Sequence, residues 1–198
     1  MSWSAPLTLK GAHVHLEPLS PARHDELVDA LRDGELWQLW YTSVPAPDQL
    51  RELIEQRLAQ RASGAWLPFA IIEAATGRAV GMTNYIDIDV QNRRLEIGGT
   101  WYRRRVQRTA LNTECKLLLL RHAFEELECI AVEFRTHFFN QQSRCAIERL
   151  GAKLDGVLRN HRILNDGSFR DTCVYSIVRE EWAAAKANLE FRLGRHST

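Results

Sequence analysis

Residues 95–127 constrain the fold most, because a strand, an arginine-rich loop and an apolar helix follow one another there without a linker. Leu95 to Tyr102 is strand-like, and Cys115 to Leu127 is strongly helical. Between them lie four arginines within six positions, Arg103, Arg104, Arg105 and Arg108. The first N–H groups of a helix have no partner inside it, and the helix dipole favours an anion there. The segment therefore predicts a phosphate site at this helix N-terminus, although an arginine run alone is as often a solvated loop.

The remainder of the chain places helices first, then an antiparallel meander, a strand–helix–strand crossover, another helix and a hairpin. Strands are predicted over 14–19, 67–73, 79–88, 93–101, 131–137, 156–164 and 169–178, and helices over 21–33, 50–58, 113–127, 141–150 and 180–193. This order predicts an α+β domain with a mixed, mostly antiparallel sheet of about seven strands flanked by helices. The helix over 113–127 is apolar on nearly all sides, so we expect it to lie buried against the sheet.

The net charge, the cysteine spacing and the lengths of the apolar runs argue against several classes of function. A net charge of +1 argues against a nucleic-acid-binding protein held by its overall field. The cysteines, Cys115, Cys129, Cys145 and Cys173, include no CxxC pair, so we expect reduced thiols and no metal site. The N-terminus lacks the features of a signal peptide, and no apolar run approaches the ~20 residues of a membrane span. The chain is expected to be soluble and cytoplasmic, without a membrane or nucleic-acid partner.

Four short motifs follow one another at characteristic spacing: Glu96–Trp101, Gln107–Asn112, Asn140–Ser143 and Leu150–Ala152. Together they resemble the GNAT superfamily of acetyl-CoA-dependent N-acyltransferases, and most closely its ribosomal-protein N-terminal acetyltransferase (RimJ/RimL-like) branch. The resemblance covers about residues 12–180, which would form the N-acetyltransferase domain, followed by a C-terminal helix and tail over 181–198. It implies direct transfer of an acetyl group from acetyl-CoA, as co-substrate, to a primary amine.

The resemblance also implies where the cofactor binds. Its diphosphate would lie on the loop and helix start, and its pantetheine arm along the preceding strand. The residues expected to hold it are Gly99, Thr100, Trp101, Arg103, Arg104, Arg105, Gln107, Arg108, Thr109, Ala110, Leu111, Asn112, Thr113 and Asn140. Ala110 and Asn112 depart from the family's small loop residues. Alanine keeps most of the close backbone approach, and asparagine tolerates left-handed geometry better than most residues.

The pair Gly98-Gly99 inside a strand indicates either a bulge or a close backbone approach. In the family, the strand at this position splays from its parallel neighbour. The resemblance therefore implies that a backbone N–H near Gly99–Thr100 points at the thioester oxygen, where it would stabilise an oxyanion.

Two residues are expected to carry the chemistry. Glu96 is the best candidate for the base that deprotonates the amine, unless it is a surface carboxylate paired with an arginine or a water relay suffices. His137 is a weaker candidate, and His122 is expected to be a core histidine. The family's tyrosine donor to the departing thiolate is missing between Asn140 and Leu150. By resemblance Ser143 would take that role, although it could also cap the helix that starts near Asn140.

Several alternatives stay open. Ala110, Asn112 and the missing tyrosine would also fit a non-catalytic acyl-CoA-binding or sensor module of the same fold, and a phosphate-binding regulatory domain is a third candidate. The acceptor could be a protein N-terminus, an antibiotic amine, a polyamine or an amino-acid derivative. Trp37, Trp40 and Tyr41 form either core or a wall of the acceptor pocket, and the last helix packs on the body or on a second subunit of a homodimer.

Overall fold

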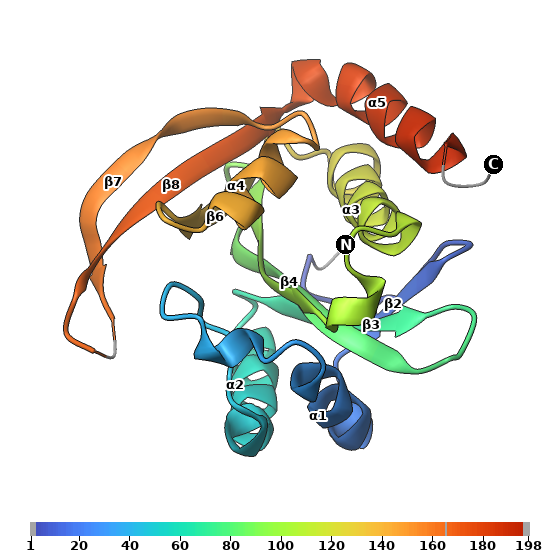
Figure 1. The fold of residues 1–198 in the computed structure, drawn as a ribbon. Coiled ribbons are helices and arrows are strands. Elements are labelled where there is room, and N and C mark those ends of the chain that lie inside the picture. Colours follow the sequence, from blue (N-terminus) through green and yellow to red (C-terminus); the bar gives the residue numbers. More distant parts are fainter. Residues whose placement is uncertain (1–2, 165, 196–198) are drawn as a thin grey trace.

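The computed structural model describes residues 3–164 and 166–195, which form an eight-stranded sheet in the order β1-β2-β3-β4-β5-β6-β8-β7 (Figure 1). Neighbouring strands are antiparallel except for β5 and β6. The strands are β1 (Leu9–Lys10), β2 (Val14–Pro18), β3 (Leu67–Glu73), β4 (Ala79–Asp89), β5 (Arg94–Tyr102), β6 (Ala131–His137), β7 (Lys153–Ile163) and β8 (Phe169–Val178). The predicted α+β class is confirmed. The strand beyond the expected seven is β1, which at two residues is too short to show a period.

Helices cover both faces of the sheet. On one face lie α3 (Ala110–Arg121) and α5 (Trp182–Gly194), and on the other lie α1 (His24–Arg32) and α2 (Leu50–Ala62), with α4 (Gln141–Glu148) between β6 and β7 (Figure 1). Each face has its own core. Phe69 and Leu119 belong to the core under α3, and Ile54 and Met82 to the core above α1 and α2. Within the described residues, no helix has both the length and the apolar character needed to cross a membrane.

Helix α3 begins earlier than expected. Thr109 caps it, because its Oγ1 accepts a hydrogen bond from the Leu111 N–H at 3.3 Å, so the helix starts at Ala110 rather than at residue 113. Asn112 therefore lies in a regular first turn and does not adopt the left-handed geometry considered for it. The left-handed residue of the loop is Arg108, with φ of 61°. Past Arg121 the chain continues as a π-helical turn, His122–Glu126, which occupies most of the remaining length predicted as helix.

The two parallel strands share only a short ladder. Residues Arg94–Glu96 of β5 pair with Ala131–Glu133 of β6, and beyond that point β5 pairs only with β4, and β6 only with β8. On the β4 side the register shifts, since Met82 lies opposite Trp101 and Asn84 opposite Gly98. Gly99 adopts φ of 58° there, which glycine reaches at low cost. Of the two alternatives for Gly98-Gly99, the structure shows the bulge, and it lies where β5 leaves β6.

The C-terminal part forms the predicted hairpin and helix. Strands β7 and β8 extend from the body as a long ribbon (Figure 1). Of the predicted turn, Asn165 lies outside the described residues, while Gly167 has φ of 82°. Helix α5 packs on the body, where the Trp182 ring stacks on Phe124 at a centroid distance of 5.2 Å.

Candidate active site

The gap between β5 and β6 opens into a cleft of about 650 Å³. Its walls come from the bulged part of β5, the second half of β6, the starts of α3 and α4, and the segment before α2. It brings together eight of the residues predicted from the sequence: Gly99, Thr100, Trp101, Gln107, Arg108, Asn112, Asn140 and Ser143. Segments far apart in the chain therefore meet at the predicted point, beside the N-terminus of α3.

The other predicted residues lie outside the cleft lining: Glu96, Arg103, Arg104, Arg105, Thr109, Ala110, Leu111 and Thr113. Two of the arginines already bind carboxylates. The Arg105 guanidinium donates to both oxygens of Glu73 at 2.7 and 2.6 Å, and these bonds lower the pKa of Glu73 to about 2. Arg103 donates through Nε to Asp33 at 3.2 Å. These two arginines thus fasten the loop to the body.

Glu96 is a buried carboxylate beside the cleft. Its Oε1 lies so close to Gly98 that a side chain at position 98 would collide with it. Burial raises the pKa of Glu96 to about 7, and Asp87 and Glu133 add to the rise, whereas Arg135, with Nε 3.6 Å from Oε2, opposes it. Gly98 and Arg135 both line the cleft. A carboxyl with a pKa near 7 next to a cleft has the property required of a general base.

His137 is less suited to accept a proton. Its Nδ1 accepts a hydrogen bond from the Phe139 N–H at 3.1 Å, so the neutral ring carries its proton on Nε2. Burial lowers the pKa of His137, with a further contribution from Arg170, which keeps the ring neutral. Nε2 is buried and has no acceptor among the described residues. The ring is therefore a donor, and Glu96 is the better base.

The aromatic residues before α2 divide between core and cleft. Trp37 packs against the core above α1 and α2, whereas Tyr41 lines the cleft. Trp40 contacts the His137 ring edge-on at a centroid distance of 5.0 Å. Two of the three aromatics thus surround the end of β6.

At the start of α4, the capping role belongs to Asn140 and not to Ser143. The Asn140 Oδ1 accepts from the Ser143 N–H at 3.0 Å. The Asn140 Nδ2 remains for another acceptor, and the Ser143 hydroxyl has no hydrogen-bond partner in the part of the chain that the structure describes. Both side chains line the cleft, so both groups are available to a ligand.

Lys116 is a cleft residue that the sequence did not reveal. Its side chain is 8% exposed, and its ammonium donates to Thr100 Oγ1 at 2.7 Å. No carboxylate within the described residues forms an ion pair with it, and burial lowers its pKa to about 8. Lysine is almost never buried without a charged partner. The only sequence signal is a cation between Cys115 and Leu117, at the start of the apolar run of the helix.

The charge of the cleft is one-sided. No aspartate or glutamate is found among its described lining residues. Its cationic lining residues are Arg57, Arg108, Lys116, Arg135, Arg149 and Arg170. The cleft is therefore suited to ligands that carry negative charge.

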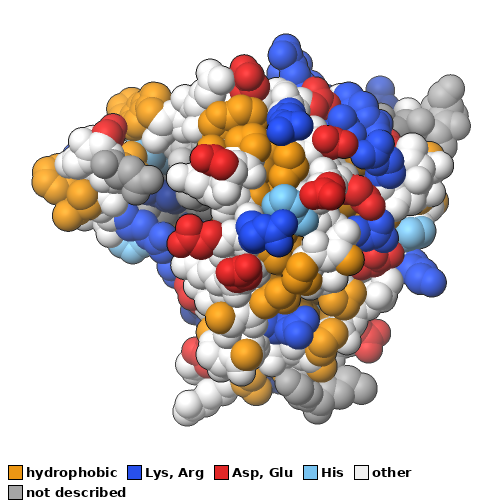
Figure 2. Space-filling view, turned by 90° about the horizontal axis from the view of Figure 1, so that it is seen from below, with side chains coloured by type: hydrophobic (Ala, Val, Ile, Leu, Met, Phe, Trp, Pro, Cys, Tyr) orange, Lys and Arg blue, Asp and Glu red, His pale blue; other side chains and the backbone are white. Residues whose placement is uncertain are grey.

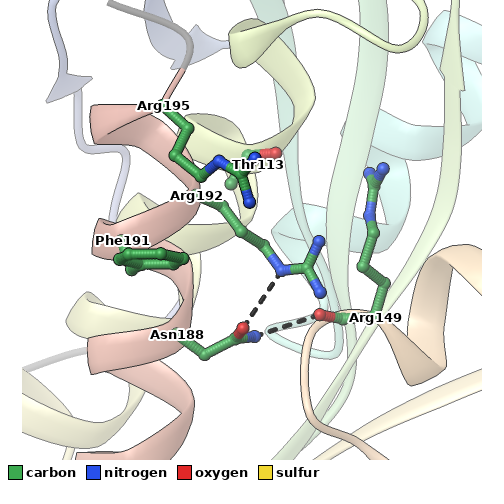
Figure 3. Close-up of a pocket in the computed structure, with 6 residues that line it drawn as sticks. All are labelled: Thr113, Arg149, Asn188, Phe191, Arg192 and Arg195. Carbon is green, nitrogen blue, oxygen red and sulfur yellow. Dashed lines mark hydrogen bonds between the residues drawn. The ribbon is translucent and has the colours of Figure 1, made fainter.

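A second pocket of about 420 Å³ lies between α5 and the facing ends of α3 and α4 (Figure 3). Arg149 lines both this pocket and the cleft, so the two adjoin. The Arg149 carbonyl accepts from Asn188 Nδ2 at 3.2 Å, and Asn188 Oδ1 accepts from Arg192 Nε at 3.0 Å. The Phe191 ring is 66% exposed beside them. Guanidinium groups beside an exposed aromatic ring suit a phosphorylated nucleoside.

The cysteines are all free, as expected. Cys115, Cys129 and Cys173 are buried, and Cys145 is exposed at the cleft. Over residues 3–164 and 166–195, no group of three or more histidine, cysteine or acidic side chains is arranged to hold a metal ion.

Comparison with known proteins gives consistent matches. A family model described as an acetyltransferase (GNAT) domain matches residues 13–153. The candidate ribosomal N-acetyltransferase YdaF of Bacillus subtilis (strain 168) is 32% identical over 110 residues, which cover 56% of this chain and 59% of YdaF. That match therefore spans less than two thirds of the relative.

Solved structures match over nearly the whole chain. A candidate acetyltransferase from T. thermophilus is 36% identical, with a TM-score of 0.84, over 96% of this chain and 99% of that one. A GCN5-related N-acetyltransferase from Brucella melitensis is 29% identical, with a TM-score of 0.85, over 94% of this chain and 85% of the other.

Proposed function

Because the chain belongs to the GNAT family of acetyltransferases, we propose that it transfers an acetyl group from acetyl-CoA directly to a primary amine. The observation that carries the proposal is the cleft where β5 leaves β6, at the bulge and beside the starts of α3 and α4. A thioester held there would be reachable from the α1–α2 side of the sheet. We propose that the catalytic domain spans residues 12–180, with the helix and tail over 181–198 as an addition.

In this proposal the cofactor lies along the α3 side of the cleft. The free first-turn N–H groups at the start of α3 and the Arg108 guanidinium face the diphosphate, since helix N-termini favour anions. The Gln107 N–H donates to the Arg104 carbonyl and the Leu111 N–H to Thr109 Oγ1, so neither is counted among them. Asn140 Nδ2 donates to the pantetheine arm, which runs along Gly99–Trp101. Arg103 and Arg105 would bind a phosphate only by leaving Asp33 and Glu73, so we assign them to positioning the loop.

The proposed reaction has three parts. The amine nitrogen attacks the thioester carbon while an N–H near Gly99–Thr100 stabilises the developing oxyanion. Glu96, directly or through a water, takes the proton that the nitrogen loses. The carbon–sulfur bond then breaks, and the Ser143 hydroxyl donates to the departing thiolate. Lys116 adds a buried positive charge on the same side as the cofactor.

A thiol-release assay tests the proposed activity. With acetyl-CoA and a panel of peptides, amino acids, polyamines and other small amines, we expect thiol release with at least one acceptor class and mass spectrometry to find the acetylated amine. The panel should include N-terminal peptides of ribosomal proteins, because YdaF is named for that substrate. If calorimetry finds tight acetyl-CoA binding while every acceptor leaves the thioester intact, the non-catalytic sensor is the better description.

We further propose that the pocket beside α5 receives the 3′-phosphoadenosine end of the cofactor, with Arg192 and Arg149 at the phosphate and Phe191 against the adenine. Arg192→Gln should then weaken acetyl-CoA binding by about 10–100-fold, because a charge-assisted hydrogen bond is lost. Calorimetry with acetyl-CoA and its 3′-dephospho analogue measures the effect.

The dephospho analogue is the internal control, since its affinity should not change in Arg192→Gln. Arg179→Gln is the matched variant, because Arg179 is exposed and lies outside this pocket. Equal losses for the two cofactors in Arg192→Gln would contradict a phosphate contact at this position.

A further inference from the structure

Arg170 places a guanidinium at the mouth of the cleft. It lies on β8 two residues before Thr172, which pairs with His137, the last residue of β6, so β8 carries Arg170 past the end of that strand. Its Nε donates to Thr172 Oγ1 at 3.0 Å. Its two terminal nitrogens have no acceptor among the described residues, and the side chain is half-buried in the cleft wall. The planar fork that arginine uses to bind carboxylates is therefore available.

No ion pair compensates the charge of Arg170 among the described residues, although the Glu96 carboxylate is close enough to act on it electrostatically. The Asp171 carboxylate is held by Arg159 and by the Asn160 N–H. Across the hairpin, the residue in register with Arg170 is another cation, Arg162.

The neighbouring Arg135, by contrast, is surrounded by acidic groups. Its guanidinium lies 2.9 Å from Glu133, 3.7 Å from Asp87 and 3.6 Å from Glu96. Glu96 is thus shared with Arg135, and Arg170 is the cation at this end of the cleft that forms no ion pair among the described residues.

Four of the six cationic lining residues fall into two groups by position. Arg108 and Arg149 lie at the α3 and α4 end, where the proposed cofactor phosphates would occupy them. Arg57 comes from α2, where it stacks on Trp66 at 4.1 Å, and Arg170 comes from the hairpin. Seen from the α1–α2 side, Figure 2 shows basic side chains at the inner edge of the hairpin. Positive charge thus also lines the side from which an acceptor would enter.

We propose that the acceptor is an amine that also carries a carboxylate, and that the Arg170 fork binds this carboxylate. The inference rests on the proposed acetyl transfer and adds the acceptor class to it. A bidentate arginine–carboxylate pair would fix the direction of the acceptor, leaving its amine toward the thioester. The remaining positive charge favours the neutral form of that amine, which is the form that attacks. A polyamine would bring further positive charge into a cleft without acidic lining, and is disfavoured.

Matched acceptors test this assignment. Each amino acid is compared with its own amide, which keeps the α-amine and loses the carboxylate, and peptides that begin with aspartate are compared with peptides that begin with asparagine. The first pair tests a free amino acid and the second an acidic N-terminus as the source of the carboxylate. In at least one pair we expect kcat/KM to favour the acid by about 10–100-fold.

The variants identify the residue responsible. Arg170→Gln should abolish the preference by lowering kcat/KM for the acid alone, and Arg170→Lys should restore part of it, since lysine keeps the charge without the fork. Arg162→Gln is the matched control, because Arg162 is exposed and outside the cleft lining, and should keep the preference.

The outcomes separate this inference from the proposed function. Turnover of amides or polyamines at the rates of the acids, or an equal loss for acid and amide in Arg170→Gln, overturns the carboxylate acceptor while acetyl transfer stands. Absence of thiol release with every acceptor overturns the proposed function, and this inference with it.

Discussion

Glu96→Gln should lower kcat by about 10²–10⁴ while the affinity for acetyl-CoA stays unchanged, because a positioned base contributes about that factor. Glutamine keeps the shape of the side chain, so it still fits against Gly98, but it cannot take a proton. Calorimetry with acetyl-CoA and single-turnover acetyl transfer measure the two quantities separately. Asp87→Asn is the control, since Asp87 is a nearby carboxylate outside the cleft lining, and it should cost little.

The pH dependence gives an independent signature of the same residue. The Glu96 pKa of about 7 places half of the enzyme in the active, deprotonated form near neutral pH. The rate should therefore fall as pH decreases through 7, provided that the acceptor amine is itself saturating and partly neutral. Glu96→Gln should lack this limb. If Glu96→Gln keeps both the decrease in rate at low pH and the rate itself, a water relay and not Glu96 accepts the proton.

The raised pKa of Glu96 also has a consequence for stability. A carboxyl whose pKa is higher in the folded than in the unfolded state lowers stability as pH rises. The cost is absent below the unfolded pKa of 4.5, grows between 4.5 and 7, and is complete above 7. Glu96→Gln should consequently unfold at higher denaturant concentration than the wild type at pH 8, and show no such advantage at pH 4. If Glu96 is a buried catalytic carboxylate, Glu96→Gln should gain stability at pH 8 and lose rate. If its role is purely structural, Glu96→Gln should lose stability at both pH values.

The architecture could be predicted from the sequence because it depends on local patterns. Hydrophobic periodicity and turn residues predict the strand–loop–helix succession over 95–127 and the hairpin around Gly167. The strand β1 was missed because two residues contain no period. The predicted start of α3 is too late, because it was placed at the beginning of the strongly apolar run. Thr109 caps the helix further upstream, so Ala110 and Leu111 also belong to it.

The site was only partly predictable, because its contacts join distant parts of the chain. Arg103 and Arg105 are alike in sequence to Arg108, yet their partners Asp33 and Glu73 lie 70 and 32 positions away. No local pattern reveals such pairs. The same holds for Gly98, whose missing side chain makes room for Glu96, and for Arg170, which becomes informative only when β8 is seen to pass the end of β6.

Lys116→Met should raise the stability of the protein and lower its acetyltransferase activity. The Lys116 pKa is about 8 instead of 10.5 because burial disfavours the charged form. Below pH 8 the lysine is charged in both the folded and unfolded states, and the folded state bears the full cost of the buried charge. Methionine has similar length and no charge, so at pH 7 we expect the free energy of unfolding to rise by ~1–3 kcal/mol. Denaturant melts measure it.

The pH profile of that gain tests its cause. Between pH 8 and 10.5 the folded wild type loses the lysine proton before the unfolded chain does, so the advantage of Lys116→Met should shrink over this interval. Lys186→Met is the matched control: Lys186 pairs with Glu125 at the surface, and its removal should give no such gain.

The activity of Lys116→Met then decides why the chain keeps this charge. The ammonium uses one donor on Thr100, which leaves two for oxygen atoms of the bound pantetheine or thioester. If these contacts exist, KM for acetyl-CoA should rise or kcat should fall by about 10-fold or more, and Lys116→Arg should recover part of the loss. Loss of stability with unchanged kinetics would instead make Lys116 a support for the Thr83–Thr100 hydroxyl pair. A residue that lowers stability is retained when selection acts on its contribution to activity. Lys116→Met measures both quantities, the free energy of unfolding and the kinetic constants, in one protein.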